Sequence, residues 1–165
     1  MATSAPTLEA IRYTRGSLQL LDQLLLPGST VFLPIPDFVT CWTAIKDMNV
    51  RGAPAIAIAA ALVLAVELDK AKATLATPSA VASFVVENMD YLCTSRPTAV
   101  NLGEAVERLK ALANRLASAS AESGVTGAAA AEAVIAECES MLASDVAANR
   151  AIGGVGAGAP GAAPG

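Results

Sequence analysis

The pattern of hydrophobic and polar positions along the chain changes near Asp37. Ahead of it lie three short apolar segments of the extended type, at residues 7–13, 17–26 and 30–33. The first two flank Thr14-Arg15-Gly16, where a glycine beside polar residues favours a turn. We therefore predict a small antiparallel β meander over residues 7–33.

From Asp37 onward, apolar residues recur three and four positions apart, which is the period of amphipathic helices. The side chains of Asp37 and Thr77 suit a helix N-cap, while Pro54 and Pro78 suit a first helical turn. We expect five helices within residues 37–152. Their apolar positions are Phe38, Cys41, Trp42, Ile45 and Met48 in the first, a run from Pro54 to about Lys72 in the second, Val81, Phe84, Val85, Met89 and Leu92 in the third, Leu102, Val106, Leu109, Ala113 and Leu116 in the fourth, and Val134, Ile135, Cys138, Met141 and Leu142 in the fifth.

The composition supports a mainly α fold, a helical bundle preceded by the small β meander, in one domain over residues 1–152. A chain of 165 residues can form one hydrophobic core, and 54% of its residues are hydrophobic against 16% charged. Alanine, the best helix former, supplies much of the hydrophobic fraction and favours closely packed helices. Residues 153–165 contain only Gly, Val, Ala and Pro without periodicity, so we expect a disordered tail there.

Charge and hydropathy argue against two classes of partner. The formal net charge is -4, without the basic stripe that a nucleic-acid backbone requires. The most apolar run, residues 53–66, is shorter than the roughly 20 residues that span a bilayer. It is followed by Glu67, Asp69 and Lys70. We expect a buried helix there, with no nucleic-acid partner and no membrane association.

The chain has no histidine and three cysteines. Without histidine it lacks the commonest metal ligand and the base of Ser–His and Cys–His pairs, so we expect no metal and no cofactor. Cys41, Cys93 and Cys138 are widely spaced and are not preceded by a signal-peptide pattern. We interpret them as small core side chains of a protein in a reducing compartment. We expect a cytoplasmic protein, with the nucleus as a second location.

The first candidate site is Val50-Arg51-Gly52-Ala53-Pro54-Ala55-Ile56. Gly52 and Ala53 precede Pro54 at the start of an apolar helix, and neither has a side-chain oxygen for the first N–H groups. A phosphate is a suitable acceptor, because a helix N-terminus carries partial positive charge and Gly52 permits close approach. Arg51 would add a charge-assisted contact. The alternative is a surface arginine and a glycine turn ahead of a core helix.

The second candidate site is Thr94-Ser95-Arg96-Pro97-Thr98-Ala99-Val100-Asn101. Pro97 favours an extended Arg96, which ends the third helix, and Thr98 is expected to cap the fourth. The alternative is a capping and packing arrangement, with Asn101 a solvated residue of the first turn. Considered together, two arginines at loop–helix junctions suit a phosphorylated small molecule.

These segments resemble the N-terminal signatures of methylthioribose-1-phosphate isomerases. The matching segments, in order, are Leu8-Glu9-Ala10-Ile11-Arg12-Tyr13, Val50 to Ile56, Thr94 to Leu102 and Asn149-Arg150-Ala151-Ile152-Gly153. The resemblance covers residues 8–153, and the order and spacing match as well. A related family, the regulatory α, β and δ subunits of translation initiation factor 2B, shares the architecture. The combination of RGAPAI with SRPTAVNL is typical of the isomerase.

The resemblance implies the N-terminal domain of an enzyme that converts methylthioribose 1-phosphate, an aldose phosphate, into methylthioribulose 1-phosphate during methionine salvage. It implies that Arg51, Gly52, Ala53 and Arg96 hold the phosphosugar, and that the protein forms a homodimer. In the family, a Rossmann-like C-terminal domain supplies the catalytic cysteine and aspartate. We expect that domain to be absent here, so we predict no catalytic residue in this chain and no activity of the chain alone.

Two alternatives remain open. The first is a non-catalytic regulatory or assembly module like the initiation-factor subunits, against which the retention of both arginine motifs argues. The second is a truncated or mispredicted gene product without a function of its own, which the Gly/Ala/Pro tail of residues 153–165 favours.

Overall fold

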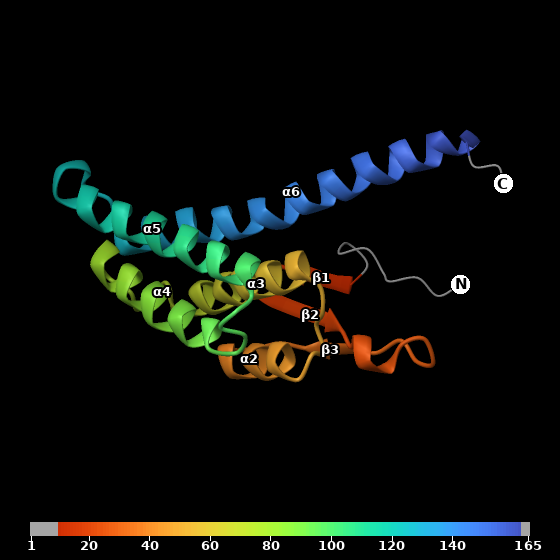
Figure 1. Ribbon diagram of the computed structural model, residues 1–165. Helices are drawn as coiled ribbons and strands as arrows, with labels where there is room; N and C mark the ends of the chain where they lie inside the picture. The colour runs from red at the N-terminus through yellow and green to blue at the C-terminus, as the bar shows by residue number, and fades with distance from the viewer. Residues whose placement is uncertain (1–9, 163–165) are drawn as a thin grey trace.

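The computed structural model describes the backbone of residues 10–162 and the side chains of residues 10–148. A small sheet is followed by a set of packed helices (Figure 1). The elements are β1 (Ile11–Thr14), β2 (Ser17–Leu21), the 3-10 helix η1 (Gln23–Leu25), β3 (Phe32–Pro34), α2 (Phe38–Lys46), α3 (Ala53–Ala71), α4 (Pro78–Cys93), α5 (Val100–Ser123) and α6 (Gly127–Ala162). The mainly α fold with a small N-terminal sheet is therefore confirmed.

The sheet is an antiparallel meander with the strand order β1-β2-β3. Leu20 pairs with Ile11 on one side and with Leu33 on the other. The strands are shorter than predicted, because Leu24 and Leu25 lie in η1 and are exposed. The Asp22 carboxylate accepts a hydrogen bond from the Leu24 N–H and thereby turns the chain away from the sheet. Residues 7–9 of the predicted meander lie outside the described part of the chain.

The predicted caps of two helices are confirmed. The Asp37 carboxylate accepts a hydrogen bond from the Thr40 N–H at the start of α2, and the Thr77 hydroxyl accepts one from the Ala80 N–H at the start of α4. The predicted extent of the first helix is wrong at its end. Helix α2 stops at Lys46, and Met48, expected on its apolar face, is exposed with a φ of 66°. A left-handed residue at this position ends a helix, as in common C-terminal motifs.

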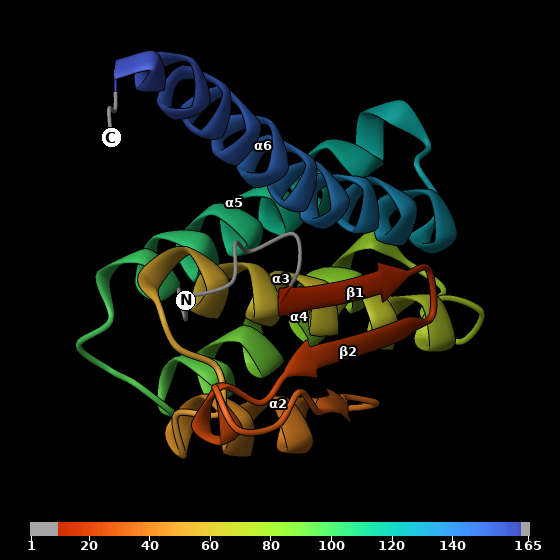
Figure 2. The ribbon, with the colours of Figure 1, turned by 90° about the vertical axis from the view of Figure 1, so that its right-hand side faces the viewer.

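Helix α3 lies at the centre of the domain. It packs against α2, α4, α5 and α6 and against strands β1 and β2. Figures 1 and 2 show α5 and α6 on one side of α3 and α2 on the other. Its leucines Leu62, Leu64 and Leu68 are fully buried, and its alanines allow neighbouring helices to approach closely. In the part of the chain that the structure describes, no helix has the length and apolar character needed to cross a membrane.

The expected disordered tail covers residues 153–165, and the structure describes the backbone of the first ten of them, residues 153–162, as helical. Helix α6 continues to Ala162, and its last turns project past the other helices (Figure 1). Helix propagation adds one hydrogen bond for each residue fixed, and alanine supports it between the glycines of this segment. Residues 163–165 lie outside the described residues.

Candidate anion-binding site

The start of α3 has the features of an anion site. Gly52 is its N-cap, with a φ of 97°, and it has no side chain to accept a hydrogen bond from the first turn. Pro54 lies in that turn, and the first intrahelical bond runs from the Ile56 N–H to the Gly52 carbonyl, at 3.0 Å. Arg51, Gly52, Ala53 and Pro54 are exposed. The positive end of a long helix therefore faces solvent beside an arginine.

Arg51 is tied to η1 by one end of its side chain. Its Nη2 donates a hydrogen bond of 3.0 Å to the carbonyl oxygen of Gln23. A guanidinium carries several N–H donors in a planar fork, so this contact leaves others for a ligand. The guanidinium is held at one point and remains able to bind an oxyanion.

The connection ahead of Arg51 is fastened to η1 by residues that sequence reasoning missed. The Asn49 side-chain amide donates to Asp22 Oδ1 at 3.0 Å, and the Gln23 N–H donates to the Asn49 carbonyl at 2.9 Å. The sequence offered little indication of this contact, since Asn49 and Asp22 are 27 positions apart.

The second predicted site lies between α4 and α5, where Arg96 is half-buried. The Trp42 Nε1–H donates to the Thr94 hydroxyl at 2.8 Å, and the Thr94 hydroxyl donates to the Tyr91 carbonyl at 2.6 Å. The rings of Trp42 and Tyr91 stack, with centroids 6.0 Å apart. Ser95 is buried, and its hydroxyl donates to the Leu92 carbonyl. Helix α2 thus fixes the residues just ahead of Arg96.

The prediction that Thr98 caps the fourth helix is wrong. The N-cap of α5 is Ala99, which makes no side-chain capping bond. The turn is closed instead by a hydrogen bond of 3.0 Å from the Ala99 N–H to the Arg96 carbonyl. Asn101 is half-buried in the first turn of α5. A second helix therefore starts beside an arginine without a side-chain cap.

The two arginine-bearing connections lie at the same end of the helical bundle. Helix α3 packs against α5, and both views place the start of α3 near the connection between α4 and α5 (Figures 1 and 2). The convergence of Arg51 and Arg96 on one ligand stays a prediction, with their Cα atoms expected within roughly 10–20 Å of one another, as befits a small-ligand pocket.

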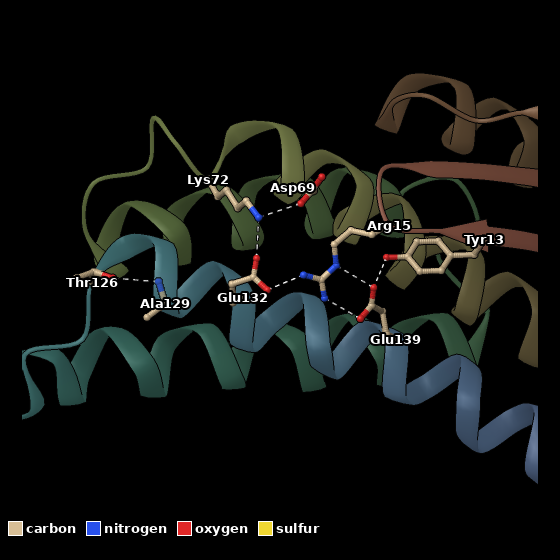
Figure 3. Close-up of polar contacts among 8 residues, drawn as sticks. All are labelled: Tyr13, Arg15, Asp69, Lys72, Thr126, Ala129, Glu132 and Glu139. Atoms are coloured by element: carbon tan, nitrogen blue, oxygen red, sulfur yellow. Dashed lines mark hydrogen bonds and ion pairs between the residues drawn. The ribbon is translucent and has the colours of Figure 1, made fainter.

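A separate cluster of ion pairs joins the sheet and α3 to α6 (Figure 3). Arg15 donates to Glu139 Oε1 at 2.9 Å and to Glu132 Oε1 at 2.6 Å, and Lys72 donates to Glu132 Oε2 at 2.8 Å. The Tyr13 hydroxyl donates to Glu139 Oε2 at 2.6 Å. Burial and this hydrogen bond raise the pKa of Tyr13 well above its usual range. Glu132 and Glu139 are seven residues apart, which is about two helical turns, so their spacing in the sequence could have indicated that they share one face of α6.

The same hydrogen bonds stabilise the charged form of both glutamates. The pKa of Glu132 is lowered mainly by the hydrogen bond from Lys72 and also by the one from Arg15. The pKa of Glu139 is lowered mainly by the hydrogen bond from Arg15. The cluster lies at the turn between β1 and β2 and at the end of α3, so it braces the fold rather than the exposed start of α3.

The cysteines are placed as core side chains. Cys41 and Cys138 are buried, and Cys93 is half-buried. Burial raises the pKa of Cys41 to about 12 and also raises that of Cys138, which disfavours the nucleophilic thiolate. Within the described residues, no group of three or more acidic, cysteine or histidine side chains is arranged to hold a metal ion.

The sequence and the fold together place this chain in a known class of protein. The chain belongs to the Initiation factor 2 subunit family, whose sequence profile matches residues 49–159. Within that class, its sequence is similar to enzymes named methylthioribose-1-phosphate isomerase. The relative from Ostreococcus lucimarinus is 58% identical over 93% of this chain, and the one from Vitis vinifera is 51% identical over 92%.

Two solved structures have similar folds. The 5-methylthioribose 1-phosphate isomerase from Pyrococcus horikoshii superimposes with a TM-score of 0.67 at 29% identity, over 80% of this chain and 35% of its own. The delta subunit of translation initiation factor eIF-2B from A. fulgidus superimposes with a TM-score of 0.68 at 28% identity, over 83% and 37%. The chain spans about 40% of the length of the curated relatives, so it corresponds to a part of each.

Proposed function

We propose that this chain is the substrate-anchoring part of a methylthioribose-1-phosphate isomerase. The observation that carries the proposal is the exposed start of α3, where Gly52 leaves the first turn without a side-chain cap and Arg51 lies beside it. The 58% identity to an isomerase of that name supports the choice of substrate.

In this proposal, Gly52 and Ala53 offer backbone N–H groups to the phosphate, and Arg51 and Arg96 add charge-assisted contacts. Both corners are rigid, since hydrogen bonds to η1 and α2 fix the residues beside each arginine. Anchoring a substrate and excluding water lower the entropic and solvation barriers to reaction. The proton or hydride movement of the aldose–ketose conversion would fall to groups outside this chain.

The proposal carries further expectations. The whole enzyme would act in methionine salvage, would form a homodimer, and would be cytoplasmic, with the nucleus as a second location. Its ligand would be the phosphosugar alone, without nucleic acid or membrane lipid. These statements come from the resemblance to the isomerases and from the acidic composition.

The alternative is a regulatory or assembly module. It is favoured by the fold similarity to the eIF-2B delta subunit, whose TM-score of 0.68 is close to the 0.67 of the isomerase from Pyrococcus horikoshii. Fold alone does not define function, so the site must decide.

The test is calorimetry on a grafted enzyme, in which this chain replaces the matching N-terminal part of the Ostreococcus lucimarinus isomerase. The graft should bind methylthioribose 1-phosphate. Arg51→Ala or Arg96→Ala should each weaken binding by about 10- to 100-fold, the effect of losing a charge-assisted contact worth ~1.5–3 kcal/mol.

The matched control is Arg115→Ala, which removes an exposed arginine of α5 and should leave affinity unchanged. If the parent isomerase binds the substrate while a folded graft does not, the anchoring role is wrong. If the graft instead co-purifies with guanine-nucleotide exchange complexes, the regulatory alternative is correct.

A further inference from the structure

Asp22 is one of two polar residues that are buried among the described side chains, with 7% of its surface exposed. A buried carboxylate is costly unless donors satisfy it. Its Oδ1 accepts from the Leu24 N–H at 3.1 Å and from the Asn49 side-chain amide at 3.0 Å. Its own N–H donates to the Val31 carbonyl at 2.8 Å. Asp22 therefore links the end of β2, η1 and the connection to α3.

A second set of contacts continues from Asp22 to the start of α3. Its neighbour Gln23 holds that connection at two points, by donating from its N–H to the Asn49 carbonyl and by accepting from Arg51 Nη2. Among the described residues, every hydrogen bond that joins the Asp22–Leu25 segment to the residues just ahead of Gly52 thus involves Asp22 or Gln23. Without the two side-chain bonds of Asp22, to Leu24 and to Asn49, Gln23 would be held to this connection by its own two bonds alone.

The braced stretch has a backbone that needs such support. It lies between two residues with positive φ, Met48 at 66° and Gly52 at 97°. Conformations of this kind persist where the surrounding structure over-determines them. The direction in which α3 presents its first N–H groups therefore depends on the contacts that hold Asn49 and Arg51.

We propose that Asp22 is the positioning residue of the anion site, fixing Asn49 and, through Gln23, Arg51 so that the Gly52 turn faces the phosphate. This inference rests on the proposed function. Asp22 does not bind the phosphate itself, because a carboxylate would repel that anion and its Oδ1 is already engaged by two donors.

The first experiment measures amide hydrogen exchange on the full 165-residue chain, without ligand. Asp22→Ala should speed exchange across residues 49–56. Asp22→Asn keeps an oxygen acceptor and should restore slow exchange. The matched control is Asp37→Ala, which removes a carboxylate that likewise accepts two local hydrogen bonds, at the start of α2. It should leave exchange over residues 49–56 unchanged.

The second experiment measures KM and kcat for methylthioribose 1-phosphate in the grafted enzyme. Asp22→Ala should raise KM by about tenfold or more, since small misplacements of an anchoring group are costly, while Asp22→Asn should stay within about threefold of the parent. Asp37→Ala should lower the melting temperature and leave KM unchanged. Asn49→Ala should also raise KM, by less than Asp22→Ala does. In the double variant, Asn49→Ala should add little to the rise in KM that Asp22→Ala causes.

The outcomes separate this inference from the proposed function. Unchanged exchange over residues 49–56 in Asp22→Ala, or a KM within about twofold of the parent in both Asp22→Ala and Asn49→Ala, would overturn the positioning role. A graft that carries wild-type Asp22 and does not use the substrate would overturn the proposed function instead. If Asp22→Ala does not fold, Asn49→Ala decides the question alone.

Discussion

Single residues decide the geometry of the candidate site. Gly52 and Met48 both have positive φ, and Asp22 joins segments far apart in sequence. The sequence allowed prediction of the glycine, because a Gly ahead of a proline-started helix is a local signal. It did not allow prediction of Met48, whose left-handed backbone follows from the contacts around it. Nor did it allow prediction of the bond between Asp22 and Asn49, because the two residues lie on different segments.

The strained backbone at Gly52 gives the first residue-scale prediction. Gly52→Ala should lower the free energy of unfolding by about 1–3 kcal/mol, because a φ of 97° is unfavourable for any residue with a Cβ. No atom lies within 4 Å of the added methyl group, so the cost is conformational rather than steric. Urea unfolding measures it.

Gly103 provides the control for that measurement. It lies inside α5, where an added Cβ also meets nothing within 4 Å. Gly103→Ala should raise stability by up to about 1 kcal/mol, since alanine is the better helix former. Equal effects of the two substitutions would show that the backbone at Gly52 is unstrained.

At the scale of elements, local patterns were reliable and long-range contacts were not. The five helices followed from the 3.6-residue period and from caps that lie next to the helices they start, at Asp37 and Thr77. The second predicted strand segment, residues 17–26, was wrong at Leu24 and Leu25, because η1 depends on a capping bond to Asp22. The ion pairs of Arg15 with α6 join residues more than a hundred positions apart, which no local pattern reveals.

The close approach of α6 to the connection between α3 and α4 gives the second prediction. A Cβ on Gly127 would lie 1.9 Å from the Leu75 carbonyl oxygen and 2.6 Å from the Ala76 carbonyl carbon. Both are backbone atoms, so Gly127→Ala should destabilise the fold by about 1–3 kcal/mol or more. Gly103→Ala is again the control, and a stability equal to wild type would contradict this packing.

The ion pairs of α6 give the third prediction, on pH. The pKa values of Glu132 and Glu139 are lowered from an ordinary value of 4.5. Their contribution to stability is therefore complete above about pH 4.5 and is lost as the pH falls through the lowered values. The free energy of unfolding in urea should decline between about pH 4.5 and 3. Because the pairs are partly exposed, salt should weaken the effect.

Glu139→Gln isolates this contribution. The variant should show a shallower decline of stability with falling pH than wild type, because one of the two carboxylates is gone. Glu122→Gln, at an exposed position of α5, should retain the wild-type decline. An identical pH dependence in Glu139→Gln and wild type would remove the cluster from the account of acid stability.

At the scale of the whole molecule, the chain is a folded unit that corresponds to about 40% of the length of its isomerase relatives. The family was predictable from sequence because its signatures lie at loop–helix junctions, where particular residues are required. How the arginines meet a ligand was not predictable, since that depends on helix packing. The structure places both junctions at one end of the bundle (Figure 2).

We predict that the 165-residue chain alone has no isomerase activity. In the proposed function the matched residues are anchors, and burial holds Cys41 and Cys138 as thiols. Binding alone does not lower a barrier unless a group acts more strongly in the transition state than in the ground state. Incubation with methylthioribose 1-phosphate should produce no ketose above the background rate. Turnover that Arg96→Ala abolishes would show that the chemistry resides in this chain.

The central claim is that the start of α3 binds the phosphate of the substrate. The most direct measurement is a crystal structure of the grafted enzyme with methylthioribose 1-phosphate bound. The account predicts phosphate oxygens within hydrogen-bonding distance of the N–H groups of Gly52 and Ala53, with the guanidinium groups of Arg51 and Arg96 both contacting the phosphosugar. A phosphate bound elsewhere, with either arginine facing away from it, would contradict the account.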